Sequence, residues 1–404
     1  MARLPDGDPA PRDGALPEAA LAGLGERPFG LYVHVPFCAT RCGYCDFNTY
    51  VPGEDGAAAA SGYVEAVLAE LDLARRTLGD GAPAAQTVFF GGGTPTLLAA
   101  ADLTRLLDGI RERFGLAPGA EVTTEANPES VDPAKLAALR EAGFTRLSLG
   151  MQSAVPRVLA TLDRVHSPGR PQAAVAEARA AGFEQVSLDL IYGTPGETAD
   201  DWRASLDAAL EAEPDHLSTY SLIVEPGTRL AAQVRRGELE PPSEDVIVDR
   251  FETAEHVLAA AGMQWYETCS WATGEAAWCR HNLGYWDGGD WWGAGPGAHS
   301  HVGGVRWWNA LHPKGWAERV RAGESPAAAR EIPDAESVRL EQVMLGLRLR
   351  SGVALDVLTD DGRAAAAEHL AGGLLEPADH AAGRAVLTLR GRLLADPVTL
   401  DLAG

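Results

Sequence analysis

Basic residues are scarce in this sequence, and lysine is nearly absent. Its 404 residues include 34 lysines and arginines against 57 acidic residues, a net charge of −23, and the only lysines are Lys135 and Lys314. Binding to a phosphate backbone needs a cationic surface, so this charge argues against a nucleic-acid partner. Long apolar runs are missing as well, and we expect no stable insertion into a membrane.

The features of an export signal are also missing. The first 27 residues are rich in proline, glycine and alanine, and no cationic start is followed by an apolar run. This composition predicts a disordered N-terminal tail over residues 1–27 of a cytoplasmic protein. In a reducing cytosol, the five cysteines are expected to bind metal or to do redox chemistry rather than to form disulfides.

Short apolar segments alternate with helical segments between about residues 30 and 222. The expected strands are Leu31–Val35, Thr87–Phe90, Glu121–Thr124, Arg146–Leu149, Gln185–Leu190 and His216–Leu222. Six β–α units predict an α/β protein with a parallel sheet, and because two further units are missing, we expect a partly open barrel. Such barrels bind ligands at the carboxyl ends of their strands. With a helix expected over 243–261, the core domain covers residues 28–262.

Two further regions follow the core. Residues 263–324 form an extension that is rich in glycine and contains nine of the ten tryptophans. Residues 325–404 are predicted to form a small α+β domain, with a helix from Asp334 to about Arg350 and a hairpin within AVLTLRGRLLADPVTL, residues 385–400. This order suggests a winged-helix-like unit. Its eight arginines against twelve acidic residues favour a structural or partner-docking role over DNA binding.

Three of the cysteines, Cys38, Cys42 and Cys45, lie within eight residues. Incidental buried thiols, a structural zinc site and an iron–sulfur cluster are the three interpretations. Zinc needs a closed tetrahedron, usually from two separated ligand pairs, and no second Cys-x-x-Cys is present. A cluster held by three thiolates keeps one iron free for a substrate. The spacing Cys-x3-Cys-x2-Cys after a strand resembles the motif of the radical S-adenosylmethionine (SAM) enzymes, which implies a [4Fe–4S] cluster and bound SAM.

Polar motifs follow the other expected strands. GGGTPT begins at Gly91, and its three glycines form either a plain tight turn or a backbone surface for the methionyl end of SAM. Glu125, Gln152 and Asp189 lie at or near the ends of the third, fourth and fifth strands. Each of them either caps the next helix or binds a ligand. A carboxylate within a buried strand, such as Asp189, needs a partner, and Arg164 is a candidate.

Nearly the whole chain resembles the oxygen-independent coproporphyrinogen III oxidases and their relatives, the HemW-type heme chaperones. The shared features are YVHVPFC, GGGTPT, EANPE, GMQS, LDLIYGTPGE and a C-terminal domain, here residues 325–404. The resemblance implies a radical SAM barrel with Cys38, Cys42 and Cys45 as cluster ligands. It also implies SAM contacts from Tyr32, Tyr44, Gly92, Gly93, Thr94, Glu125, Gln152, Arg164 and Asp189. The decarboxylases bind two SAM molecules, and some of these positions belong to the second.

Two departures separate the branches of this family. The decarboxylases carry a fourth cysteine two residues after the third, where this chain has Phe47. The segment CRHNLGYW, residues 279–286, matches the His-Asn-x-x-Tyr-Trp signature of the chaperone branch. The resemblance therefore implies a chaperone that binds heme and transfers it to an unidentified acceptor protein. The alternatives are an oxidative decarboxylase of coproporphyrinogen III, supplied by an unidentified electron donor, and a metal-stabilised structural module without SAM chemistry.

The HNLGYW segment supplies candidate heme ligands. Imidazole and phenolate both ligate heme iron, and in a helix His281 and Tyr285 share one face. Nearby tryptophans suit the faces of a porphyrin, and Arg280 or Arg306 suits its propionates. In an alternative without heme, His281 and Asn282 bond each other in a Trp-rich core. Other candidate ligands close by in the sequence are His299, His301 and His312.

Overall fold

One large sheet organises the fold. The computed structural model describes residues 4–51, 62–164 and 166–404. Twelve strands form this sheet in the order β12-β11-β10-β9-β1-β2-β3-β4-β5-β6-β8-β7, and β9 and β1 to β6 run parallel. The six predicted strands correspond to β1 (Phe29–Val35), β2 (Ala85–Gly92), β3 (Leu116–Ala126), β4 (Arg146–Gln152), β5 (Gln185–Tyr192) and β6 (His216–Ser221). Because β12 and β7 lie at opposite ends of the sheet and do not pair with each other, the prediction of an open α/β barrel is confirmed.

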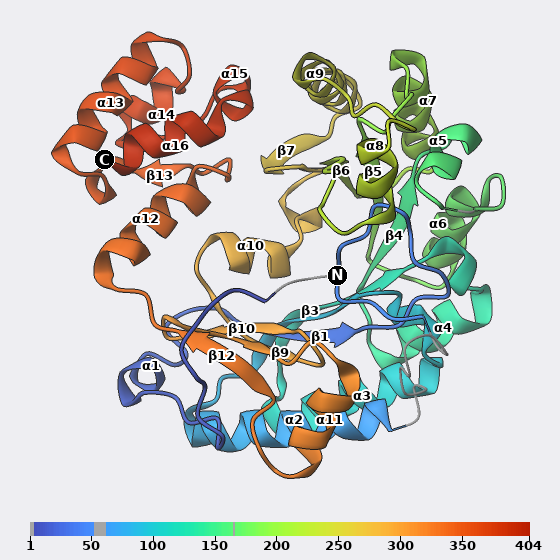
Figure 1. Cartoon of the computed structure of the whole chain (residues 1–404), viewed down its shortest axis with the longest axis vertical. Helices are drawn as coiled ribbons and strands as arrows, with labels where there is room; N and C mark the ends of the chain where they lie inside the picture. The colour runs from blue at the N-terminus through green and yellow to red at the C-terminus, as the bar shows by residue number, and fades with distance from the viewer. Residues whose placement is uncertain (1–3, 52–61, 165) are drawn as a thin grey trace.

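Helices cover the convex outer face of the curved sheet (Figure 1). The long ones are α2 (Tyr63–Leu78), α3 (Ala100–Phe114), α4 (Pro133–Ala142), α6 (Arg170–Ala180), α7 (Ala199–Leu210) and α9 (Glu244–Ala260); short ones in connecting segments are α1 (Glu18–Ala22), α5 (Pro156–Thr161) and α8 (Arg229–Arg235). Side chains cap the starts of two of these helices: Asp132 caps α4, and Thr198 forms a reciprocal capping box with Asp201 on α7. The main core lies between sheet and helices, which leaves the concave face for polar residues.

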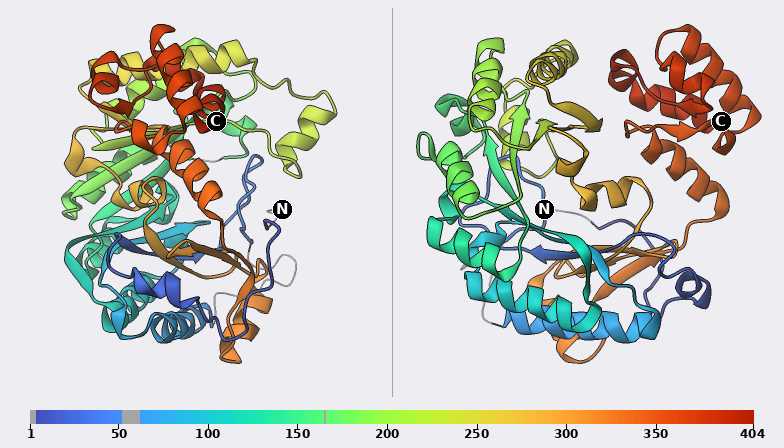
Figure 2. Two further views of the ribbon diagram at one scale, coloured as in Figure 1. Left: turned by 90° about the vertical axis from the view of Figure 1, so that its left-hand side faces the viewer. Right: turned by 180° about the vertical axis from the view of Figure 1, so that it is seen from behind.

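The Trp- and Gly-rich region, predicted as one extension, is divided between both edges of the sheet. Its strands are β7 (Gln264–Glu267), β8 (Ser270–Ala272), β9 (Asp290–Ala294), β10 (His299–Val302) and β11 (Val305–Asn309), and β12 (Ala327–Glu331) follows. β8 and β7 continue the sheet beyond β6, whereas β9 to β12 extend it from β1. Between the two groups, α10 (Arg280–Trp286) crosses the concave side and contacts β1 and β2 (Figures 1 and 2).

A buried carboxylate fastens this region to the barrel. Glu70 on α2 accepts hydrogen bonds from the Gly295 N–H (2.8 Å), the Asn309 amide (2.6 Å) and the Trp316 indole (2.7 Å). Burial raises the pKa of Glu70 to about 7, and the three donors oppose that rise. Because Gly295, Asn309 and Trp316 come from β9, β11 and α11 (Pro313–Arg321) or the segments beside them, the region is an integral part of the barrel domain.

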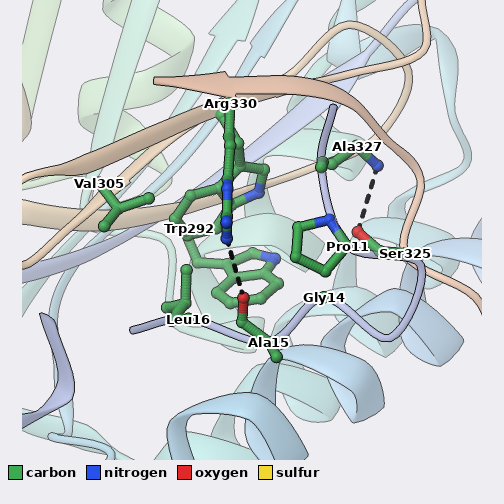
Figure 3. A pocket seen from close by; sticks show the side chains of 11 residues that line it. Pro11, Gly14, Ala15, Leu16, Trp292, Val305, Ser325, Ala327 and Arg330 are labelled. Carbon is green, nitrogen blue, oxygen red and sulfur yellow. Dashed lines mark hydrogen bonds between the residues drawn. The ribbon is translucent and has the colours of Figure 1, made fainter. Parts of the chain in front are cut away.

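Residues 4–27 differ from the predicted disordered tail, because they pack along the edge of the sheet. Asp8 and Arg330 of β12 exchange both backbone hydrogen bonds, at 2.9 and 2.8 Å. Figure 3 shows Pro11 and Leu16 facing Trp292 across a small pocket. The edge strand offers unpaired backbone groups, and the tryptophan offers apolar surface, so a Pro- and Ala-rich segment gains contacts by lying there.

The C-terminal unit begins later than predicted and is mostly helical. Its elements are α12 (Ala335–Gly346), β13 (Val353–Ala354), α13 (Asp360–Ala371), α14 (Pro377–Ala381), β14 (Arg384–Ala385), α15 (Leu389–Leu393) and α16 (Ala395–Ala403). The α+β composition is confirmed, but the predicted hairpin over 385–400 is wrong. Thr388 caps α15, and Val398 and Leu402, four residues apart, bury one face of α16 in the unit's own core. β12 belongs to the main sheet, which moves the start of this unit to α12.

This unit packs on the edge of the barrel at β7. The Thr268 N–H donates to the Arg348 carbonyl (3.0 Å), and the Arg350 N–H donates to the Tyr266 carbonyl (2.8 Å). Arg392 of α15 lies over the Trp265 ring at 4.2 Å. In the described part of the chain, no helix combines the length and apolar character that crossing a membrane requires.

Candidate functional site

The three clustered cysteines lie in the loop that follows β1, held in place at its centre by Gly43. The Gly43 N–H donates to the Leu162 carbonyl (3.1 Å), and its own carbonyl accepts from the Leu230 N–H (2.8 Å). A Cβ at this position would lie 2.5 Å from a carboxylate oxygen of Asp163, so only glycine fits without displacing it. The segments after β4 and β6 therefore fix the shape of the cysteine loop.

The thiols are half-buried and lie close to donors from neighbouring loops. The Arg164 guanidinium donates to Cys42 Sγ at 3.5 Å, and the Thr94 hydroxyl points at Cys38 Sγ at 4.0 Å. Burial, followed by the charge of Cys45, raises the pKa of Cys38 to about 11. Thiolates in this loop therefore need nearby positive charge, which Arg164 and a bound metal cluster both supply.

The thiol arrangement also bears on the choice between zinc and a cluster. Within residues 4–51, 62–164 and 166–404, no three His, Cys, Asp or Glu side chains converge on a single ion. A structural zinc ion holds its thiolates at about 2.3 Å from one centre. In an iron–sulfur cluster each thiolate binds a different iron, so the ligands are spread more widely.

The glycine-rich turn after β2 packs directly on β1 and the cysteine loop. Gly92 has φ +110°, and a Cβ there would lie 2.5 Å from the His34 ring. A Cβ on Gly93 would lie 2.6 Å from the Phe37 carbonyl oxygen, and the Gly93 N–H donates to the Val35 carbonyl (2.8 Å). Close packing against β1 and the cysteine loop therefore explains why Gly92 and Gly93 are glycines. This agrees with the tight turn, one of the two interpretations of GGGTPT that the sequence allowed. The turn also places Thr94 beside the cysteines.

Two carboxylates face the concave interior. Glu125 on β3 accepts the Gly92 N–H at 3.0 Å, and Asp189 on β5 accepts the Ser148 hydroxyl at 3.0 Å. Burial and then the charge of Asp189 raise the pKa of Glu125 to about 7. Burial also raises the pKa of Asp189, although the hydroxyl groups that bond to Asp189 and the positive charge of Arg146 oppose the rise. Neither carboxylate caps a helix, so both are available to a ligand in the barrel.

Gln152 and Arg164 lie at the carboxyl end of β4. Gln152 has φ +59°, a left-handed backbone that is uncommon outside glycine, and its buried Oε1 has no hydrogen-bond partner among the described residues. A strained backbone with an unpaired buried oxygen is typical of a ligand position. Arg164, predicted as a partner for an acid, donates instead to Cys42 and to the Gly150 carbonyl (3.0 Å). Its guanidinium is still near enough to Asp189 for its charge to oppose the rise in the pKa of that carboxyl.

Of the two tyrosines predicted to contact SAM, Tyr32 lies on β1 and Tyr44 lies within the cysteine loop. On β1, the Tyr32 hydroxyl bonds to His34 Nδ1 at 3.0 Å, and His34 Nε2 lies 2.9 Å from the Asn48 carbonyl. Tyr44 packs in a small apolar cluster with Leu162. The structure thus brings all the predicted cluster and SAM residues to the carboxyl ends or concave faces of β1 to β5 and to the loops beside them.

His281 and Tyr285 share one face of α10, as predicted. His281 Nε2 lies 2.8 Å from the Tyr285 hydroxyl, and its Nδ1 lies 2.8 Å from the Thr87 hydroxyl. The ring is 3% exposed, and burial lowers the pKa of His281 to about 3. Both ring nitrogens are therefore engaged, although not with Asn282, the partner that the sequence suggested.

Several residues of the site were missed by sequence reasoning. Glu121 on β3 accepts the backbone N–H groups of Arg280 and His281 and so holds the first turn of α10 against the barrel. Phe89 stacks on His281 at 5.1 Å, and Tyr32 stacks on the same ring at 6.4 Å. Alternation along β2 and β3, which places residues 87, 89, 121 and 125 on one face, is the signal that would have found Glu121 and Phe89.

Comparison with known proteins identifies the family. A family model of the radical SAM superfamily matches residues 32–209. The Mycobacterium tuberculosis protein named heme chaperone HemW is 54% identical over 95% of this chain and 97% of its own length. The chain belongs to the HemW family. The Escherichia coli heme chaperone HemW is 38% identical over 68% of this chain and 70% of its own, and bovine radical S-adenosyl methionine domain-containing protein 1, mitochondrial, is 35% identical over 81% and 75%.

A solved structure shares the fold of this HemW family member along nearly its whole length. It is coproporphyrinogen III oxidase HemN from Escherichia coli, a radical SAM enzyme, with a TM-score of 0.81 over 97% of this chain and 94% of that one. The two sequences are 24% identical, so this similarity concerns the fold alone. The radical SAM family implies a [4Fe–4S] cluster and SAM.

Proposed function

We propose that this protein is a heme chaperone, which binds heme and passes it to an acceptor protein. The observation that carries the proposal is its 54% identity to a protein of that name over 95% of the chain. The HNLGYW segment supports it, because it matches the signature of the chaperone branch and forms α10 at the wall of the open barrel. The acceptor is a protein able to take up heme.

We infer that Cys38, Cys42 and Cys45 hold a [4Fe–4S] cluster with SAM beside it. When bound, such a cluster supplies a single electron to SAM. The Arg164 guanidinium at Cys42 stabilises the negative charge of the thiolates, and the half-buried loop limits the access of water. The residues proposed to contact SAM are Tyr32, Tyr44, Gly92, Gly93, Thr94, Glu125, Gln152, Arg164 and Asp189.

Gln152 offers a direct test of the SAM site. We expect Gln152→Gly, which removes the unpaired oxygen and tolerates the positive φ, to weaken SAM binding about tenfold, the loss of one hydrogen bond to a charged group. Isothermal titration of the reconstituted protein measures it, with iron content unchanged. Gln172→Ala on α6, whose amide donates to the Ala208 carbonyl, is the control. Equal SAM affinity in wild type and Gln152→Gly would remove Gln152 from the site. Gly92 is a poor test, because a side chain there strikes His34.

The alternative function, oxidative decarboxylation of coproporphyrinogen III, is favoured by one observation, the fold shared with HemN. Position 47 argues against it. The decarboxylases resemble this chain but carry a fourth cysteine there, whereas Phe47 presents a side chain that is 61% exposed. A phenyl ring offers neither a thiolate nor a hydrogen bond to a substrate. We therefore propose heme transfer, and not decarboxylation, as the function.

Titration with heme under anaerobic conditions tests the chaperone proposal. The reconstituted protein should saturate at about one heme per chain, with a Soret band distinct from that of free heme, because an imidazole ligand changes the iron coordination. Addition of an apo heme protein should then move the heme to the acceptor, visible as the acceptor's own spectrum. Absence of saturable binding would exclude the proposed function.

A further inference from the structure

His281, the histidine of the HNLGYW segment, is poorly placed to ligate heme iron. Its two ring nitrogens are bonded to Thr87 and Tyr285, at 2.8 Å each, and Phe89 covers one face of the ring at 5.1 Å. Ligation through either nitrogen would break one of these bonds and leave Thr87 or Tyr285 unpaired next to the core. A histidine with a free nitrogen on the surface is a better ligand.

His301 on β10 has that free nitrogen. Its Nδ1 lies 2.8 Å from the Gly289 carbonyl, which accepts a proton and so places the hydrogen on Nδ1 and the lone pair on Nε2. No residue in the described ranges bonds to Nε2, and the side chain is 16% exposed. Burial lowers the pKa of His301, which keeps the ring in the neutral form that binds iron. A backbone acceptor on the far nitrogen is the usual support for a metal-ligating histidine.

Flat aromatic side chains flank His301 on the same face of the sheet. His301 stands opposite Trp291 of β9, and their rings lie 5.2 Å apart. Two residues along β10, His299 stands opposite Trp308 of β11, with the rings stacked at 5.9 Å. Opposed residues in antiparallel strands share a face. Trp308 is 3% exposed and lies against Gly7, so the exposed part of the face consists of the Trp291 indole, His299 and the ligating imidazole of His301. The indole of Trp291 suits the plane of a porphyrin.

This face is continuous with the HNLGYW segment. The Tyr285 ring meets the Trp291 ring at 4.6 Å, and Tyr285 bonds to His281. The segment therefore borders the face through the contact of Tyr285 with Trp291, which explains how it can matter for heme without supplying the ligand.

Two cations lie beside His301. Arg306 stands opposite it on β11 and is paired with Glu331 (2.8 Å) and Glu341 (2.5 Å). Arg27 binds the buried Asp290 carboxylate through Nε (3.2 Å), and its side chain is 40% exposed. Heme carries two propionates, and the terminal N–H groups of Arg27 suit one of them.

We propose that heme binds on the β9–β11 face with His301 Nε2 as its iron ligand, Trp291 against the porphyrin, and Arg27 at a propionate. This inference rests on the proposed function, because it names the site of the same cargo.

The test compares three histidine variants of the reconstituted full-length protein. His301→Ala should weaken heme binding at least tenfold and shift the Soret band, since the iron loses its protein ligand, and added imidazole should restore the wild-type spectrum. His299→Ala, on the same strand and face, and His281→Ala should keep the wild-type Soret position. Iron content and SAM affinity should stay unchanged in His301→Ala, which separates a lost ligand from a lost fold.

His301→Gln, similar in size but without an imidazole, provides the same test if the alanine variant folds poorly. An unshifted Soret band in both His301 variants, or a shift in His299→Ala or His281→Ala instead, would overturn the proposed heme site. In that case, heme binding by the wild type would still support the chaperone function. A wild type that binds no heme would overturn both.

Discussion

Replacement of Cys42 by alanine is expected to lower bound iron from about four to less than one per chain and to abolish the visible charge-transfer absorbance. With three protein thiolates, the cluster already has one iron without a protein ligand, and loss of Cys42 leaves two. Arg164 would also lose the Sγ that it contacts at 3.5 Å, leaving its charge uncompensated in the loop. Iron and sulfide analysis of the anaerobically reconstituted variant measures the effect.

Cys269→Ala is the matched control, because Cys269 lies in the turn between β7 and β8 and outside the cysteine loop. It should retain the iron and the absorbance of the wild type. The thermal unfolding of Cys42→Ala should stay cooperative, since the sheet and its core are built from residues far from the loop. A Cys42→Ala protein with about four irons, or a wild type that binds zinc stoichiometrically, would favour the structural metal module instead.

The barrel was predictable from the sequence because its signals are local. Short apolar segments located the six parallel strands, and the helices between them begin at local cap residues such as Asp132 and Thr198. The pairing of β9 with β1 was not predictable, because the Phe29–Asp290 register joins residues far apart in the chain and β9 is a short strand in a Trp-rich region. The C-terminal hairpin failed for a related reason: Thr388 is favourable in a strand but also caps a helix, and tertiary packing selected the helix.

The candidate site shows the same contrast between features that local sequence signals predict and features that depend on long-range contacts. The strand-end rule placed Glu125, Gln152 and Asp189 together, since the carboxyl ends of neighbouring parallel strands meet at one edge. The state of His281 depends on Thr87, which is 194 residues away, and no local pattern signals that hydrogen bond. The free nitrogen of His301 depends on the Gly289 carbonyl across a turn. Sequence motifs therefore name the residues that gather at a site, and the hydrogen bonds decide which of them remain free for a ligand.

An assay for decarboxylation of coproporphyrinogen III distinguishes a heme chaperone from a decarboxylase. Supplied with coproporphyrinogen III, SAM and a low-potential reductant under anaerobic conditions, the wild type should form no protoporphyrinogen beyond background, whereas the Escherichia coli coproporphyrinogen III oxidase HemN in the same assay should turn over repeatedly. Two independent features lead to this expectation: Phe47 stands where the decarboxylases carry a cysteine, and residues 281–286 carry the HNLGYW signature.

Phe47→Cys tests whether the missing thiol alone accounts for the inactivity. We expect this variant to stay inactive, because the concave side of the barrel is also shaped by α10, whose His281 packs against Tyr32 and Phe89. The same preparation of wild type should bind heme and deliver it to an apo acceptor, so that inactive protein is not mistaken for a carrier. Chromatography of the porphyrin products measures turnover. Repeated decarboxylation by the wild type would replace the chaperone proposal with the enzyme, whatever its affinity for heme.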